Sequence, residues 1–535
     1  TIADFNYVST FNPADDFDCA TQILQSDYQL QYVSTGSGDG IRGVFSHSTT
    51  FAGDIDPNTA GVQNSTIRQS FGLSETSLGT SDVNVYNNGG TVQGQTFKGQ
   101  AGALPGNTWP NPYENYGPLV QVPFLIAPVA ISYDPVYKKV RNGSGGIDTY
   151  RFRIKNPLSD IDPTTGNPIV VGGLRLDQEG YCKIFTGQIT NWNDPKLRSL
   201  NGQSLEDAAD PAPSAAFSVP LQIVGRADSS GTTSLFTRHL AAVCTGFGRV
   251  DVNGNNVQND ADGDIYANSS STLPLVLRNN NSVYTFNAAN NDAPAAEVLG
   301  KFTTSQGNEG VARYVAFTKE PGGNAGDQLV QGRMGYNGPD YILPAVLSTN
   351  ANTYGLHAAA LLVNTGAGVK WRMPNVKGAS RAFGSVLPPQ ANANGSYNAG
   401  VVANGLRANP QDWVQGADRS VPLANPAAIP GANDELYPIV GTSNFLTYTC
   451  FRSNRQRQPV QDFLKKFTSV KAFTDPVTGV LAASGFAPLP SAWRTAVFQT
   501  FTGNTLNGLG VNLQIGTKNI AGAAPVCATI PGQGA

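Results

Sequence analysis

The segment Leu221–Val243 constrains the fold more than any other part of this 535-residue chain. Its first residues, Leu221–Gly225 (LQIVG), form a short apolar run that is typical of a buried strand. Thr232–Val243 then carries apolar residues at helical spacing, and the preceding Ser-Ser-Gly is a typical helix start. Because other short strand-like runs are interspersed with helical ones, the sequence predicts an α/β protein.

Further segments extend this pattern. Strands are expected at Gln29–Val33, Leu119–Tyr133, Gln222–Gly225 and Tyr437–Tyr448, and helices at Ile41–Phe45, Thr232–Val243 and Gln458–Phe467. The region Lys138–Leu176 is richer in strand-like and turn residues than in helical ones, so we expect an inserted β element there. Polar loops at 87–106, 250–271 and 391–409 are expected to be surface excursions.

Composition restricts the classes of function. Charged residues make up 14% of the chain, the formal charge is 35 − 38 = −3, and no basic run is present. A general attraction to nucleic acid or to anionic membranes is therefore excluded as the main role. The longest apolar stretch, Pro118–Tyr133, is interrupted by Gln121, Pro123 and Pro128, so no transmembrane segment is expected. The chain begins at Thr1 without Met or a signal-like segment, which we interpret as a mature chain whose signal peptide has been removed.

The cysteines and histidines do not form a metal-binding pattern. The chain has 5 Cys and 3 His without a CxxC pair, so neither zinc nor an iron–sulfur cluster is expected, and no metal is assigned. Asp260, Asp262 and Asp264 partly resemble a calcium loop, but Ser271 stands where a bidentate Glu is needed, which favours a solvated turn. Two disulfides plus one leftover thiol are the simplest interpretation and favour an oxidising compartment, with five buried reduced thiols as the alternative.

Three segments contain residues suited to binding an oxyanion. The first, Ser34–Gly40 (STGSGDG), leads into a helix, where glycines allow backbone N–H groups to approach a ligand and the helix start favours negative charge. It is not a Walker loop, because no Gly-Lys-Ser/Thr follows. A simple turn is the alternative interpretation.

The second segment, Arg226–Thr233 (RADSSGTT), connects the expected strand to the expected helix. Arg226 can present a planar, two-toothed donor to a tetrahedral oxyanion, and the residues at the helix start can add hydroxyl and backbone donors. Asp228 would hold the guanidinium in position from behind. A helix cap with a surface salt bridge is the alternative.

The third segment, Gly79–Asp82 (GTSD), offers a carboxylate. An ionised carboxylate only accepts hydrogen bonds, so Asp82 beside an anion would repel a fully deprotonated tetraoxyanion and accept one that still carries a proton. Phosphate at neutral pH is mainly such a species, whereas sulfate is not. A turn-forming Asp is the alternative.

In this order, the segments resemble the periplasmic phosphate-binding proteins of phosphate ABC transporters, and especially the secreted DING branch that includes low-molecular-weight alkaline phosphatases. The resemblance rests on STGSGDGIR, GTSD, PLVQVPFLIAPVAISYD, CKIFTGQITNWND, GRADSSGTTSLFTRHL, GRMGYNGPDYI, YPIVGTSNFLTYTC and SGFAPLPSAW, which together span nearly the whole chain. It implies a type II periplasmic-binding-protein fold, with two α/β lobes around a ligand cleft, enlarged here by loop and β insertions. The crossing strands are expected near Ile126–Ile131 and Tyr437–Phe445, which makes lobe I residues 1–127 plus 441–535 and lobe II residues 128–440.

The resemblance also implies the site. The phosphate-binding residues carried over are Thr10, Phe11, Ser37, Asp82, Arg226, Ser230, Gly231 and Thr232, with Asp228 in support. The family's first loop is Gly-rich, whereas residues 6–13 read NYVSTFNP, so the approach of backbone N–H groups is expected to differ here. The DING pattern further implies the disulfides Cys182–Cys244 and Cys450–Cys527, which leave Cys19 unpaired.

Three functions are consistent with these features. The favoured one is an extracytoplasmic (periplasmic or secreted) protein that closes two lobes around HPO4²⁻, with phosphate as its partner and no cofactor. The second is a secreted DING-type alkaline phosphatase acting on phosphomonoesters, for which no catalytic residue is assigned. The third is an extracellular assembly subunit that reuses the fold and associates through the N-terminus, the loops or Cys19. Whether an ABC permease receives the phosphate is left open by the sequence.

Overall fold

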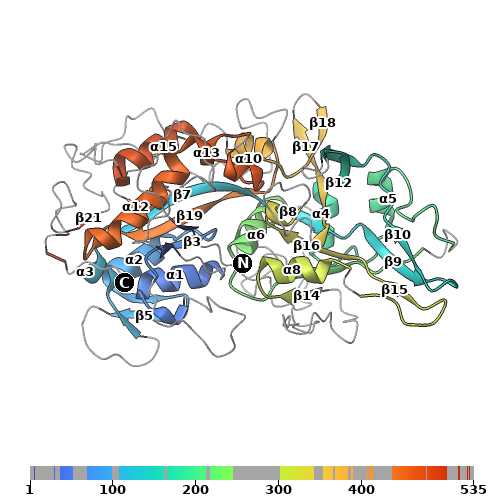
Figure 1. The fold of residues 1–535 in the computed structure, drawn as a ribbon, viewed down its shortest axis with the longest axis horizontal. Helices are drawn as coiled ribbons and strands as arrows, with labels where there is room; N and C mark the ends of the chain where they lie inside the picture. The colour runs from blue at the N-terminus through green and yellow to red at the C-terminus, as the bar shows by residue number, and fades with distance from the viewer. Residues whose placement is uncertain are drawn as a thin grey trace, which may run out of the picture.

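A computed structural model gives the architecture of most of the chain (Figure 1). It describes residues 5–6, 29–30, 36–51, 69–98, 108–161, 166–211, 217–244, 302–317, 319–342, 354–365, 368–383, 387–389, 407, 409–413, 436–477, 479–502, 516–517, 527 and 529–530. Thr10, Phe11, Cys19, the calcium-like segment and the polar loop 250–271 lie outside these residues, as does most of loop 391–409.

One sheet consists of three antiparallel strands in the order β3 (Gly72–Ser74), β19 (Val440–Tyr448) and β7 (Leu119–Pro128). β19 pairs with β7 along its whole length, from Val440 opposite Pro128 to Tyr448 opposite Leu119. Figure 1 shows α12 (Asn454–Ser469) and α15 (Ser491–Val497) on one side of these strands, and α1 (Ser37–Ser46) and α2 (Thr80–Asn88) on the other.

The second sheet is larger and mixed. Its order is β11 (Leu158–Ile161), β12 (Pro168–Leu176), β17 (His357–Thr365), β8 (Ala130–Tyr133), β16 (Arg333–Asn337), β13 (Gln222–Arg226) and β14 (Phe302–Ser305), and β18 (Gly368–Arg372) also pairs with β17. The parallel strands β13 and β14 are each followed by a helix, namely α6 (Gly231–Val243) and α8 (Gly307–Val315). The starts of both helices therefore lie at the same edge of this sheet, where α/β proteins commonly bind ligands.

The two sheets are connected where β7 leads into β8. Val129 separates these strands, its N–H donates to the Ile439 carbonyl (2.8 Å), and its own carbonyl accepts from the Tyr437 hydroxyl (2.9 Å). One hydrophobic cluster extends through both sheets. The described parts of the two sheets thus pack as one continuous body.

Smaller elements complete the structure. They are η1 (Thr49–Phe51), β4 (Gly90–Val92), β5 (Gln95–Lys98), β6 (Thr108–Pro110), α3 (Pro112–Tyr116), β9 (Val136–Arg141), β10 (Ile147–Arg151), α4 (Gln178–Phe185), α5 (Pro195–Asn201), β15 (Gln328–Val330), η3 (Pro339–Tyr341), α10 (Val376–Phe383), β20 (Cys450–Phe451), α13 (Lys471–Thr474), α14 (Val480–Ala483), a π-helical turn (Phe498–Thr502), β21 (Gly516–Thr517), and the pair β1 (Phe5–Asn6) and β2 (Gln29–Leu30).

The expected elements are present, with three differences. The expected strand Leu119–Tyr133 is split into β7 and β8. The region Lys138–Leu176 is β-rich as expected, but only β9 and β10 form a separate sheet with β15, whereas β11 and β12 join the large sheet. The loop expected at 87–106 contains a hairpin, because Gln93 and Gly94 both adopt positive φ angles (49° and 74°) and make the tight turn between β4 and β5.

Candidate functional site: an oxyanion cradle

The start of α6 has the geometry expected from the sequence. Ser230 is the fully buried N-cap of the helix, and its Oγ accepts a hydrogen bond from the Thr233 N–H (3.2 Å). The Thr233 hydroxyl shares a 2.7 Å hydrogen bond with Tyr336, whose oxygen also accepts from the Arg226 N–H (3.3 Å). The loop between β13 and α6 is thereby fixed at both ends.

The Arg226 side chain lies beside this helix start and is only 5% exposed. Its Nε donates to Asp228 Oδ1 (2.7 Å) and its Nη2 donates to Asp228 Oδ2, so the two side chains form an ion pair. Its Nη1 donates to Asn308 Oδ1 (2.6 Å) at the start of α8. Counting only partners among the described residues, these bonds leave one further N–H on each terminal nitrogen of the guanidinium, in the fork arrangement that suits an oxyanion.

Asp228 is held as an ionised group. Burial opposes its ionisation, but the hydrogen bonds and positive charge of Arg226 outweigh burial and lower the pKa of this carboxyl. Asp228 Oδ1 also accepts from the N–H of Gly307, the first residue of α8 (3.0 Å). The pair therefore ties the β13–α6 loop to the neighbouring helix start.

The glycine-rich segment before α1 packs directly against this loop. The Gly38 N–H donates to the Ser229 carbonyl (3.3 Å), and the Gly231 N–H donates to Ser37 Oγ (3.1 Å). A Cβ atom on Gly38 would lie 2.7 Å from the Ser229 hydroxyl oxygen, closer than real Cβ contacts. The glycine is required here because the two loops approach so closely.

We call the group formed by Ser37, Arg226 and Ser230–Thr232 the cradle. A second carboxylate beside Asp228, Glu75, also lies in it and is not among the residues predicted from the sequence. Glu75 follows β3, its N–H donates to Ser37 Oγ (3.2 Å), and its Oε2 accepts from the Thr232 hydroxyl (2.6 Å). Burial raises the pKa of Glu75, while the Thr232 hydrogen bond and the charge of Arg226 act against this increase. A Cβ atom on Gly231 would lie 2.5 Å from the Glu75 Cβ, so these two residues are in direct contact.

The carboxylate expected from the sequence, Asp82, makes a local contact in the structure. It occupies the first turn of α2, where its Oδ2 accepts from the Gly79 N–H (2.9 Å) and caps the helix. Burial raises the pKa of Asp82, and the Gly79 bond lowers it. Within the described residues, Asp82 forms no hydrogen bond or ion pair with Ser37, Arg226 or Thr232.

The structure thus brings together most of the expected residues and adds others. Those in the cradle are Ser37, Arg226, Asp228, Ser230, Gly231 and Thr232, joined by the unexpected Glu75 and Asn308. The local sequence signal for Glu75 is limited to its position after the run Phe71–Ser74, which places it at the end of a strand but not beside Ser37. No group of His, Cys, Asp or Glu that could hold a metal ion occurs among the described residues.

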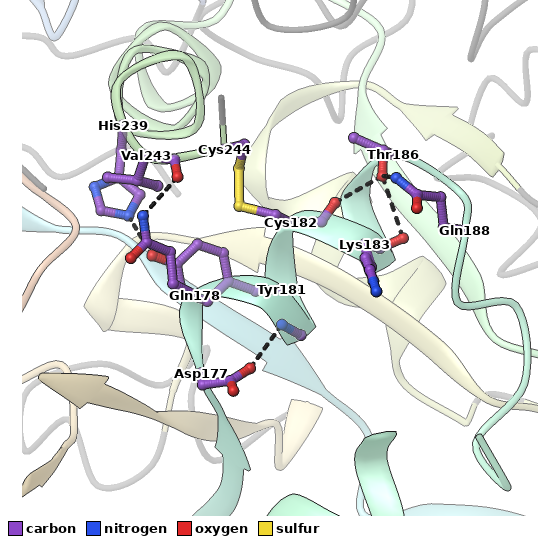
Figure 2. The surroundings of a disulfide bond; sticks show 11 residues. Asp177, Gln178, Tyr181, Cys182, Lys183, Thr186, Gln188, His239, Val243 and Cys244 are labelled. Atoms are coloured by element: carbon purple, nitrogen blue, oxygen red, sulfur yellow. Dashed lines mark hydrogen bonds between the residues drawn. A yellow bond between two sulfur atoms is a disulfide. The ribbon is translucent and has the colours of Figure 1, made fainter. Parts of the chain in front are cut away.

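The far end of α6 is anchored by a disulfide (Figure 2). Cys244, the C-cap of α6, is bonded to Cys182 of α4. Beside it, Gln178 Nε2 donates to the Val243 carbonyl (2.5 Å), and the Tyr181 hydroxyl hydrogen-bonds His239 Nε2 (3.0 Å). Burial lowers the pKa of His239 to about 3, so the imidazole is neutral and structural.

The second expected disulfide, Cys450–Cys527, is also present. Two disulfides are typical of an extracytoplasmic protein. Among the helices that the structure describes, none is long and apolar enough to cross a membrane.

Comparison with known proteins agrees with this architecture. Residues 113–342 match the PBP superfamily domain. A phosphate-binding protein from an unknown prokaryotic organism is 27% identical over 61% of this chain and 66% of its own length, just under two thirds. Alkaline phosphatase L of Pseudomonas aeruginosa is 25% identical over 86% of this chain and 88% of its own.

Among solved structures, a crystal structure of a DING protein superposes with a TM-score of 0.53 and 20% identity, covering 95% of this chain and 93% of that one. This match supports the fold: the α/β class and the two-lobed periplasmic-binding-protein architecture expected from the sequence are confirmed. The chain therefore contains a segment that matches the PBP superfamily domain, and it is similar over most of its length to phosphate-binding and DING proteins.

Proposed function

We propose that this protein is an extracytoplasmic phosphate-binding protein that holds HPO4²⁻ in the cradle between the glycine loop and the start of α6. The observation that carries the proposal is the position of Glu75, which accepts a hydrogen bond from Thr232 and lies in the field of Arg226. A carboxylate beside the anion donors selects an anion that carries a proton.

The donors proposed for the phosphate oxygens come from three places. Arg226 offers its two remaining N–H groups, Ser37 and Thr232 offer hydroxyls, and the starts of α1 and α6 favour negative charge. On binding, the phosphate proton takes the place of the Thr232 hydrogen at Glu75, and Thr232 turns its hydroxyl to a phosphate oxygen. The expected residues Ser230 and Gly231 belong to the same set.

We assign the proton-accepting role to Glu75 in place of Asp82. Both are carboxylates near the first sheet, but only Glu75 contacts Ser37 and Thr232 among the described residues. Thr10 and Phe11 remain proposed ligands that complete the cradle.

The lobe division is likewise a proposal. Lobe I comprises 1–127 plus 441–535 and lobe II comprises 128–440, and β7 and β19 are the crossing strands. Their pairing and the Val129–Ile439 bond support this division. Release and uptake of phosphate then require the glycine loop and the α6 start to separate.

Calorimetric titration tests this proposal directly. Protein stripped of endogenous ligand should bind phosphate at about neutral pH, and absence of binding would refute the proposed function. Glu75→Gln should weaken the discrimination of phosphate from sulfate, whereas Asp82→Asn should leave it unchanged. The opposite result would return the acceptor role to Asp82.

Phosphomonoester hydrolysis is a second candidate, because a relative named Alkaline phosphatase L aligns over 86% of this chain. The three histidines offer it no base in the cradle: His47 bonds Tyr448, His239 bonds Tyr181, and His357 packs on Tyr133. Turnover of p-nitrophenyl phosphate that is lost in Arg226→Ala would favour hydrolysis.

The finer aspects of location and partners are proposals of the same kind. Delivery to an ABC permease predicts a periplasmic protein, whereas scavenging predicts a secreted one. Fractionation of the cells that make it distinguishes the two. Self-association through the N-terminus, loops or Cys19 predicts a mass above 56.3 kDa in light scattering.

A further inference from the structure

The start of α8 contacts both members of the Arg226–Asp228 pair. The Gly307 N–H donates to Asp228 Oδ1 (3.0 Å), and the Oδ1 of the next residue, Asn308, accepts from Arg226 Nη1 (2.6 Å). Gly307 has a positive φ of 67°, a backbone conformation that residues with a Cβ rarely adopt. The dipeptide Gly307-Asn308 therefore places one donor and one acceptor against the same ion pair.

The Arg226 guanidinium is held at two different places. Asp228 binds the edge formed by Nε and Nη2, with Nε 2.7 Å from Asp228 Oδ1. A planar group that is held along one edge can still rock about that edge. Nη1 lies off this edge, so its bond to Asn308 fixes the plane of the guanidinium. The direction of the N–H groups that are left for an anion therefore depends on both partners.

Asn308 is itself anchored through buried polar groups. Its carbonyl accepts from Asn337 Nδ2 (3.0 Å), and Asn337 Oδ1 accepts from the Ser132 hydroxyl (2.7 Å). Asn337 and Ser132 are both fully buried, on the paired strands β16 and β8. Hydrogen-bonded networks in a buried environment are rigid and costly to disrupt. The interior of the large sheet thus sets the position of Asn308.

An amide suits this position better than a carboxylate. Asp228 already supplies a carboxylate to Arg226, so the charges of the pair cancel. The Asn308 amide accepts a further hydrogen bond from the guanidinium without adding negative charge. A second carboxylate at this place would repel an anion bound to the remaining N–H groups.

We propose that Asn308 is a positioning residue for the anion site: as a neutral acceptor, it fixes the plane of the Arg226 guanidinium so that the two remaining N–H groups bind one phosphate together. The inference rests on the proposed phosphate-binding function and adds to it a residue that the sequence did not predict. Asn308 acts through the guanidinium, so its contribution to affinity must disappear when the guanidinium is replaced.

A double-mutant cycle tests this role. Phosphate affinity is measured by calorimetric titration at about neutral pH for wild type, Asn308→Ala, Arg226→Lys and the double variant. Lysine keeps the positive charge but has no planar fork. Asn308→Ala should weaken binding about tenfold when Arg226 is present, and less than about twofold in the Arg226→Lys background. Equal losses in both backgrounds would show that Asn308 has only a structural role, and would overturn the inference.

The need for a neutral acceptor is tested by a separate variant. Asn308→Asp keeps an acceptor oxygen and adds a negative charge, so it should weaken phosphate binding at least about tenfold. An affinity within about threefold of wild type would contradict the charge argument.

Asn201→Ala is the control for loss of a hydrogen-bonded asparagine. Asn201 Oδ1 accepts from the Arg175 N–H (3.0 Å), and the residue lies in α5, which Figure 1 shows away from α8. This variant should lose stability without losing phosphate affinity. A loss of affinity equal to that of Asn308→Ala would mean that the effect is not specific to the site, and would contradict the inference.

The outcomes separate the two hypotheses. If the wild type does not bind phosphate, the proposed function fails and this inference fails with it. If it binds but the cycle shows no coupling, only this inference is overturned. Asn308→Ser, which also lacks the amide oxygen, replaces Asn308→Ala if that variant does not fold.

A second measurement applies if Arg226→Lys binds phosphate too weakly for titration. NMR then follows the exchange of the Arg226 Nη1 hydrogens with water in the wild type and in Asn308→Ala. The exchange should be faster in the variant, because the bond to Asn308 Oδ1 is lost. An equal rate in both proteins would contradict the positioning role of Asn308.

Discussion

Removing the Cys182–Cys244 disulfide should destabilise the protein without changing its site. α6 begins in the cradle and ends at this disulfide. The contribution of the disulfide to stability can therefore be separated from its effect on the site. The cross-link closes a loop with a sequence separation of 62 residues. Chain entropy then gives about 4 kcal/mol of stability, which is an upper value because real disulfides often deliver less.

The start of α6 is held independently of its end. Ser230 caps Thr233, Thr233 bonds Tyr336, and the Gly231 N–H bonds Ser37 across the cradle. None of these contacts involves the helix end shown in Figure 2. We therefore expect the phosphate affinity of the double variant Cys182→Ala/Cys244→Ala to stay within about threefold of wild type under conditions where both are folded.

The assay combines urea unfolding with phosphate titration. The matched control is Cys450→Ala/Cys527→Ala, whose separation of 77 residues gives a chain-entropy loss within about 0.2 kcal/mol of the first. Both variants should lose stability, and neither should lose affinity. A drop in affinity of more than about tenfold with stability preserved would show that the disulfide positions the cradle, and would refute the reasoning.

Three further predictions concern the cradle. Gly38→Ala should weaken phosphate binding at least about tenfold, because the added Cβ would lie 2.7 Å from the Ser229 hydroxyl oxygen. The control Gly323→Ala should leave the affinity unchanged, because a Cβ there would have no atom within 4 Å. Thr232→Val removes the hydroxyl that donates to the partly buried Glu75 carboxylate and should lower the free energy of unfolding in urea by about 1–3 kcal/mol; no change would mean that water replaces the hydroxyl. Because the pKa of Asp228 is lowered in the folded state, its ion pair with Arg226 stabilises the fold at neutral pH. This contribution is lost as the pH falls through the folded-state pKa of Asp228. Asp228→Asn should therefore weaken the dependence of the free energy of unfolding on pH in the acid range.

Local patterns predicted the part of the site built from one continuous segment. Arg226, Asp228 and Ser230 lie within a strand, a loop and a helix start, and each of these has its own sequence signal. The Arg226–Asp228 pair and the Ser230 cap form within a few residues of each other. Because both contacts are short-range, the local sequence was enough to predict them.

The carboxylate could not be found in the same way. Asp82 stands in a Gly-Thr-Ser-Asp sequence that equally describes a helix start, and the structure uses it as one. Glu75 reaches the cradle only because β3 pairs with β19, a strand more than 360 residues later, which sets β3 beside α1. Such a placement follows from long-range strand pairing, which a local sequence pattern does not predict.

The charge balance of the cradle explains how a chain with a net charge of −3 can be suited to an anion. Asp228 neutralises Arg226, and Glu75 adds a further carboxyl group, so the cradle does not attract anions by excess positive charge. Binding must instead depend on directed hydrogen bonds, and on protons that keep the carboxyl groups from repelling the ligand. Phosphate and sulfate dianions have the same charge and nearly the same shape, so under the proposed function a cradle of this composition would separate them by the proton that only phosphate brings to Glu75.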